Sequence, residues 1–205
     1  DCADLWAMAE SPVSATTLPL SLSVSCLDEP QQHDPTWKKK FQEKIADFSP
    51  LQVSSGIPAS SLIKNTLIGG DCFDVSNITF YGNTKSRGTF SNGASSINIS
   101  TGVVLSTGDV NMLPGPNDFD DSDGGYDDNN TDDPDLKKLI NSNQFDLSKI
   151  EFDFVPTANT VKFEFVFGSE EYCEFVGSNY NDVFGFFISG PGITGTQNIG
   201  LIPGT

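Results

Sequence analysis

The feature that most constrains the fold is a pair of alternating segments in the C-terminal half of the chain. Ile150, Phe152 and Phe154 alternate with Glu151, Asp153 and Val155. After a connection at residues 156–159, apolar Val161, Phe163, Phe165 and Phe167 alternate with intervening Lys162, Glu164 and Val166. A period of two residues is typical of β-strands that bury one face. The two segments therefore predict antiparallel strands joined as a hairpin.

Other short apolar segments separated by Gly, Asn and Ser turns extend the same pattern. Strands are expected at residues 66–69, 77–81, 96–99 and 102–106, and a central strand covered on both faces at 183–189. A short helical turn is expected at residues 134–141, beginning with Pro134. Many short strands with frequent turns predict an all-β domain over residues 51–205, with a β-sandwich or jelly-roll architecture.

The first 50 residues differ from the rest and predict an N-terminal appendage of one strand and one amphipathic helix. Apolar residues alternate from Leu18 to Cys26, as in a half-buried strand. Asp34 is a candidate helix N-cap, and Pro35 follows at the first helical position. Trp37, Phe41, Ile45 and Phe48 then form one apolar stripe. Four lysines lie off that stripe, either as a solvated face or as a docking surface for an acidic body.

Charge limits the classes of partner. The 205 residues include 11 basic and 28 acidic residues, a formal net charge of −17. Such a chain repels phosphate backbones and anionic lipid, so binding to nucleic acid is not expected. No apolar run is long enough to insert into a membrane. The first residue is Asp1 and no basic-then-apolar leader precedes the strands, which we interpret as a mature or trimmed product.

Nine of the acidic residues are aspartates between Asp118 and Asp135, with no lysine or arginine among them. Calcium prefers six to eight oxygen ligands from carboxylates, amides and backbone carbonyls. The stretch does not fit an EF-hand template, so the signal is compositional. A second polar set follows at residues 169–172 and 179–182. We hypothesise a calcium site that draws on both sets; the alternative is a solvated acidic loop beside ordinary strand-end residues. The candidate ligands are Asp132, Asp133, Asp135, Glu170, Glu171 and Asp182.

The cysteines indicate an oxidising compartment. Cys2, Cys26, Cys72 and Cys173 are widely spaced and contain no CxxC pair. With one histidine in the chain, a zinc site is not expected. Three disulfide connectivities are open, of which we favour Cys2–Cys26 with Cys72–Cys173; four buried free thiols are the alternative.

Catalysis has little support in the sequence. The single histidine, His33, lies far along the chain from any nucleophile-like serine, and no G-x-S-x-G motif is present. Paired carboxylates could hydrolyse glycosides, and Glu170, Glu171 and Asp182 are the candidates for that role. We predict that the protein is not an enzyme.

A series of ordered motifs resembles a known family. The series opens with Asn65-Thr-Leu-Ile-Gly-Gly70, Gly102-Val-Val-Leu-Ser-Thr-Gly108, Gly115-Pro-Asn117 and Asp133-Pro-Asp-Leu136. It continues with Phe165-Val-Phe-Gly-Ser-Glu-Glu-Tyr172, Asn181-Asp-Val-Phe-Gly-Phe-Phe-Ile-Ser-Gly-Pro-Gly192 and Ile199-Gly-Leu-Ile-Pro-Gly-Thr205. Over residues 58–205 the chain resembles the choice-of-anchor L domain family of secreted bacterial surface proteins. The resemblance implies a non-catalytic extracellular β module at the bacterial cell surface.

The chain departs from the family pattern at two places. Family members usually have proline where this chain has Cys173, and the family pattern continues beyond the final Pro-Gly-Thr. We therefore expect a domain that is incomplete at its C-terminus, with exposed strand edges. Strand donation between subunits could complete it and build a homo-oligomer or filament.

Two functions from different classes follow. The first is a structural or adhesive surface module, a candidate filament subunit stabilised by calcium and disulfides. The alternative is a carbohydrate-binding β-sandwich that recognises a surface or glycan ligand through exposed aromatic residues. The candidate aromatic residues are Trp6, Tyr126, Tyr172 and Tyr180.

Overall fold

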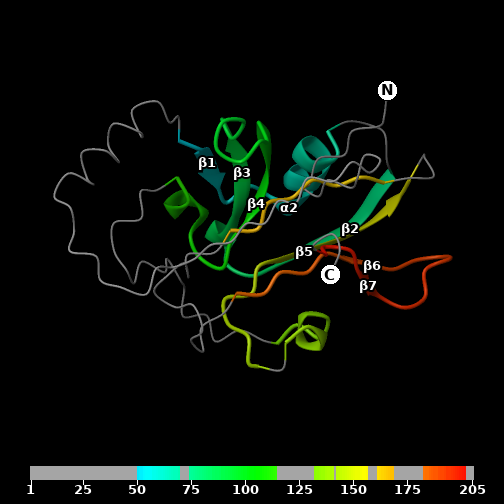
Figure 1. Cartoon of the computed structure of the whole chain (residues 1–205). Coiled ribbons are helices and arrows are strands. Elements are labelled where there is room, and N and C mark those ends of the chain that lie inside the picture. Colours follow the sequence, from blue (N-terminus) through cyan, green and yellow to red (C-terminus); the bar gives the residue numbers. More distant parts are fainter. Residues whose placement is uncertain are drawn as a thin grey trace, which may run out of the picture.

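The structure is a computed structural model that describes residues 50–69, 74–114, 132–140, 142–156, 161–168 and 182–201. Strands prevail over helices in these residues, which confirms the all-β class (Figure 1). The strands are β1 (Gln52–Ser55), β2 (Asp74–Tyr81), β3 (Arg87–Ser91), β4 (Thr101–Leu105), β5 (Lys149–Val155), β6 (Phe187–Ile188) and β7 (Gln197–Asn198). The helical segments are α2 (Ala59–Ser61), η1 (Leu62–Leu67), η2 (Thr84–Ser86), η3 (Val110–Met112) and η4 (Leu136–Lys138).

Three antiparallel sheets are present in the described part of the chain. β3 is the middle strand of the order β1-β3-β4, while β2 pairs with β5 and β6 pairs with β7. Phe90 on β3 lies opposite Gly102 on β4. A Cβ atom at Gly102 would lie 2.7 Å from the Phe90 ring, so the glycine makes room for that ring.

The strongest sequence pattern forms β5, but its partner differs from the prediction. β5 pairs with β2 along its whole length, with Val75 opposite Phe154 and Phe80 opposite Ile150. The predicted strands at 150–155 and 77–81 are thus confirmed. The predicted hairpin with residues 161–167 is wrong, because residues 161–168 form no strand. Their aromatic rings pack instead: the centroids of Phe163 and Phe186 are 4.5 Å apart.

Some of the other predicted elements are confirmed and others are wrong. The strand at 102–106 is confirmed as β4, and the helical turn at 134–141 as η4. Residues 66–69, predicted as a strand, lie at and just beyond the end of the π-helical η1, and residues 96–99 form a turn region. Of the run at 183–189, only the two residues of β6 are in a strand. The β1 and β3 strands were not predicted, because their short polar sequences carry little hydrophobic periodicity.

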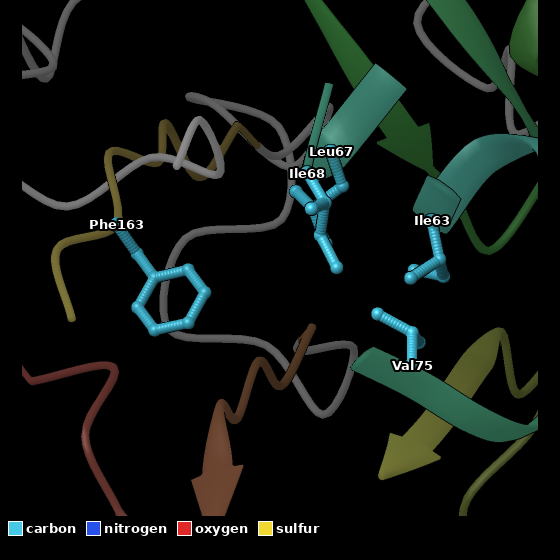
Figure 2. Close-up of a cluster of buried hydrophobic side chains, with 5 residues drawn as sticks. All are labelled: Ile63, Leu67, Ile68, Val75 and Phe163. Carbon is cyan, nitrogen blue, oxygen red and sulfur yellow. The ribbon is translucent and has the colours of Figure 1, made fainter. Parts of the chain in front are cut away.

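The core lies where the helical segment meets the sheets. Ile63, Leu67 and Ile68 point from η1 and the residue after it toward Val75 on β2, and the Phe163 ring lies beside them (Figure 2). Partly buried side chains complete this core: Ile78, Val103, Ile150, Phe152, Phe154, Val161 and Phe186. Full burial of one such aliphatic side chain stabilises a fold by about 1.5–3 kcal/mol. The core therefore joins β2, β4, β5 and η1 into one packed body.

The predicted appendage at residues 1–50 lies outside the described residues, apart from Pro50. Cys2, Cys26, Cys72 and Cys173 lie outside them as well. Within the described ranges, no helix has the length and apolar character needed to cross a membrane.

Candidate functional site

Three of the predicted calcium ligands lie in one described segment, residues 132–140, and Asp133 is its centre. The Asp133 side chain is 3% exposed. Its Oδ1 accepts hydrogen bonds from the backbone N–H groups of Asp135 at 2.9 Å and Leu136 at 3.0 Å. Pro134 cannot donate and has a fixed φ, which favours a turn directly after Asp133. Asp133 thus stabilises the turn that leads into η4.

The second oxygen of Asp133 faces the start of β5. Lys149 Nζ donates to Asp133 Oδ2 at 2.6 Å and to Glu151 Oε1 at 3.1 Å. The same ammonium lies 4.7 Å from the centroid of the Tyr81 ring, because Tyr81 is the β2 residue opposite Lys149. The Lys149 side chain is 27% exposed. The ion pair therefore ties the η4 segment to the edge of the β2–β5 sheet.

A buried amide completes the site. Gln144 Oε1 accepts from the Asp133 backbone N–H at 2.9 Å, and Gln144 Nε2 donates to the Asp133 carbonyl oxygen at 3.3 Å. The Gln144 backbone N–H donates to Asp132 Oδ1 at 3.1 Å. Burial without such partners would be costly for an amide. We call Asp133, Gln144, Lys149 and Glu151 the Asp133 cluster.

The electrostatics follow from these contacts. Burial alone would raise the pKa of Asp133, but hydrogen bonds from Lys149 and from the Leu136 and Asp135 backbone outweigh it, so this pKa lies below its ordinary value. Burial alone would lower the pKa of Lys149, but its hydrogen bonds to Asp133 and Glu151 outweigh burial and raise that pKa. The geometry favours the charged pair at neutral pH.

The remaining predicted ligands are placed as follows. Lys137 Nζ donates to Asp132 Oδ2 and Lys138 Nζ donates to Asp135 Oδ1, each at 2.6 Å. Each described carboxylate of the η4 segment thus has its own lysine. Asp182 is half-buried at the start of residues 182–201, whereas Glu170 and Glu171 lie outside the described residues. No group of three or more metal-ligating side chains comes together among the residues that the structure describes.

Sequence reasoning missed Gln144, Lys149 and Glu151. A charge signal for Lys149 exists, because Lys137, Lys138 and Lys149 are the first basic residues after the nine aspartates. Opposite charges close in sequence can pair across a turn. No pattern in the sequence distinguishes Gln144 from the polar residues beside it.

A second surface feature is aromatic. The Phe184 ring lies 4.9 Å from the Phe165 ring and 5.8 Å from the Phe167 ring, measured between centroids. Phe167 is 48% exposed and Phe184 is 38% exposed. We call Phe165, Phe167 and Phe184 the aromatic patch.

Comparison with known proteins gives one match. A family model described as the choice-of-anchor L domain matches residues 52–205, from the first residue of β1 to the last residue of the chain. The match covers well over half of the sequence and includes all helices and strands described above. No curated protein and no solved structure matches significantly.

Proposed function

Because the chain belongs to the choice-of-anchor L domain family, we propose that it is a non-catalytic structural and adhesive module of a bacterial surface protein. Membership in the family indicates a surface-anchored extracellular module. The single observation that carries the proposal is the match over residues 52–205, which spans both main sheets and the Asp133 cluster. The adhesive role goes beyond that match and needs its own test.

The contacts of the Asp133 cluster support a structural role. Asp133 Oδ1 is held by two backbone N–H groups and its Oδ2 by Lys149. A carboxylate with these partners is stabilised in its charged form, whereas a general acid near neutral pH needs a raised pKa. The pKa of Asp133 is instead lowered. We expect the cluster to fix the η4 segment against β5.

Attachment of the source bacterium tests the adhesive role. We expect cells that lack this module to attach to surfaces less than wild-type cells, and complementation with the wild-type chain to restore attachment. Complementation with a variant whose exposed Met112 is changed to alanine serves as a control and should also restore it. Unchanged attachment in the deletion strain would contradict the adhesive role.

Calcium and disulfides remain part of the proposal as stabilising features. Asp132, Asp133 and Asp135 are each engaged by a lysine, so calcium binding through them has to displace those ion pairs. Glu170, Glu171 and Asp182 are the other proposed ligands. Calcium titration followed by thermal melting tests the site, because a ligand that binds only the folded state raises Tm. A Tm that does not rise at millimolar calcium contradicts the calcium site.

Nonreducing peptide mapping tests the proposed disulfide pairs.

Filament formation by strand complementation is supported by the sheet edges. β1 and β4 are the outer strands of the β1-β3-β4 sheet in the described part of the chain. An outer strand offers unpaired backbone groups to a second copy. Negative-stain microscopy of native material tests this: fibres are expected, and a uniform population of monomers contradicts it.

The aromatic patch favours carbohydrate binding as a second candidate function. Aromatic rings that are partly exposed can stack on the apolar faces of sugars, and Phe167 and Phe184 are of this kind. A glycan array tests it with the isolated chain. Binding that is lost in Phe167→Ala, but kept in a Met112→Ala control at another exposed apolar position, supports this function. Absence of binding by the wild-type chain contradicts it.

A further inference from the structure

Asn92 and Gly93 form the one Asn-Gly sequence of the chain, directly after the end of β3. In such a sequence the backbone nitrogen of the glycine can attack the side-chain amide of the asparagine, because glycine has no side chain to block the approach. We propose that Asn92 is a deamidation site, which the folded turn protects and which reacts when this turn opens. The proposal is independent of the proposed function, because it depends only on the chemistry and the contacts of this turn.

The turn lies where three strands meet. The last residue of β3 pairs with the first residue of β1 and with the first residue of β4. Asn92 has a φ of 52–64° in common with the other left-handed asparagines and is exposed, whereas Gly93 is buried. A Cβ atom at Gly93 would lie 2.2 Å from the backbone oxygen of Ile99, so only glycine fits at this position. The packing therefore requires the residue that makes Asn92 reactive.

Two hydrogen bonds engage the reacting atoms in the folded turn. The Gly93 N–H, which carries the attacking nitrogen, donates to the Ser100 backbone oxygen at 3.1 Å. Asn92 Nδ2, which is the leaving group, donates to the Pro50 backbone oxygen at 2.9 Å. The Leu51 side chain also packs beside this turn, 3.1 Å from the position of a Cβ atom at Gly93. Ring closure breaks both hydrogen bonds, so the reaction needs a local opening of the turn.

The reaction balances with water as the only co-reactant. In the opened turn, the Gly93 nitrogen gives its proton to solvent and forms a bond to Asn92 Cγ, and the bond between Cγ and Nδ2 breaks. Nδ2 takes up a proton from solvent and leaves as ammonia, and a succinimide ring remains. Water then opens the ring at either of its two carbonyl groups, which gives aspartate or isoaspartate at position 92. One amide is hydrolysed in total, and no atom is oxidised or reduced.

The product does not restore the closed turn. A carboxylate at position 92 has no N–H group to donate to the Pro50 carbonyl oxygen, and two acceptors then face each other. The isoaspartate product also adds one carbon to the backbone, which displaces the Gly93 N–H from the Ser100 oxygen. Deamidation is therefore a one-way change that loosens the start of β1.

Peptide mapping of the full chain tests the site. The chain is incubated in mildly alkaline buffer, once folded and once in guanidinium chloride, and is then cut with trypsin, which releases residues 88–137. Fragment masses show which asparagine has exchanged its NH2 group for OH. We expect Asn92 to react first in the unfolded chain, and at least about tenfold more slowly in the folded chain. Equal rates in the two states, or another asparagine that reacts first in the unfolded chain, overturns the proposal.

Two pairs of variants test the opening and its consequence. Leu51→Ala removes packing beside Gly93, so we expect faster deamidation of the folded chain and faster hydrogen exchange of the Gly93 amide. Met112→Ala, at an exposed position, should leave both rates unchanged. Asn92→Asp reproduces one product and should speed exchange at Gly93 more than Asn92→Gly, which keeps the positive φ without a carboxylate. An unchanged deamidation rate in Leu51→Ala, or equal exchange in the two Asn92 variants, also overturns the proposal.

Discussion

Replacing Asp133 with alanine removes the acceptor of three hydrogen bonds at once. The backbone N–H groups of Asp135 and Leu136 lose their hydrogen-bond acceptor, which costs about 1 kcal/mol. Lys149 loses a charge-assisted hydrogen bond, a contribution of about 1.5–3 kcal/mol in a buried site. The Lys149 side chain is 27% exposed and keeps Glu151 as a partner. We therefore assign about 1–2 kcal/mol to the lost hydrogen bond between Lys149 and Asp133. Asp133→Ala should therefore lower the free energy of unfolding by about 2–3 kcal/mol.

Urea denaturation of the full chain, followed by circular dichroism, measures this loss. Asp135→Ala is the matched control, because Asp135 lies in the same turn and forms an exposed ion pair with Lys138. The control should cost no more than about 0.5–1 kcal/mol. Equal losses in the two variants, or a loss below about 1 kcal/mol in Asp133→Ala, would refute the reasoning.

The remaining predictions concern packing and pH. Gly88→Ala should destabilise the fold by about 1–3 kcal/mol, because the added Cβ would lie 2.1 Å from a backbone oxygen of β1. Gly168→Ala, with no atom within 4 Å of the added Cβ, should be neutral or stabilising in the same denaturation assay. Ile63→Ala should cost about 2–5 kcal/mol in the core, whereas Met112→Ala at an exposed position should cost less than about 1 kcal/mol; similar losses would contradict the core assignment. Hydrogen bonding from the Asn111 backbone, opposed by burial, lowers the pKa of Asp109. Its charged form therefore stabilises the fold above the unfolded pKa of about 3.9, and the cost of Asp109→Ala should shrink as the pH falls through the lower folded value. A cost that is constant with pH would contradict this assignment.

The sequence predicts strands where the alternation is strong and one face is buried. β5 has apolar residues at Ile150, Phe152 and Phe154, all half-buried on one face, and its existence follows from that period. Its partner does not follow, because pairing depends on which strand offers a matching register. β2 offers that register despite the irregularity between Ser76 and Thr79. The sequence therefore predicts a hairpin with residues 161–167, but this hairpin does not form.

The helical segment η1 is not predicted from the sequence, for a related reason. Thr66 and Ile68 are β-branched residues, which favour strands in isolation. Leu62, Ile63 and Leu67 are nevertheless buried on one side of a helical segment. Tertiary packing therefore outweighed local propensity.

The candidate site was predicted in part. The aspartates of residues 132–135 stand out by composition, and the structure places Asp133 at the centre of a polar cluster. The partner Lys149 lies 16 residues away and reaches Asp133 only because β5 returns the chain to the η4 segment. Gln144 contributes through the fold alone, since nothing in the sequence marks its burial. An aspartate-rich stretch therefore indicates possible oxygen ligands, but it does not reveal which lysines form ion pairs with these aspartates.

Surface display is the claim on which the proposed function rests most directly. Intact cells of the source bacterium can be treated with protease and then probed with an antibody raised against residues 52–205. A cytoplasmic protein serves as the internal control for cell integrity. We predict that the antibody labels intact cells and that protease removes the signal while the cytoplasmic control persists. A signal that appears only after lysis and survives protease treatment of intact cells would contradict the account.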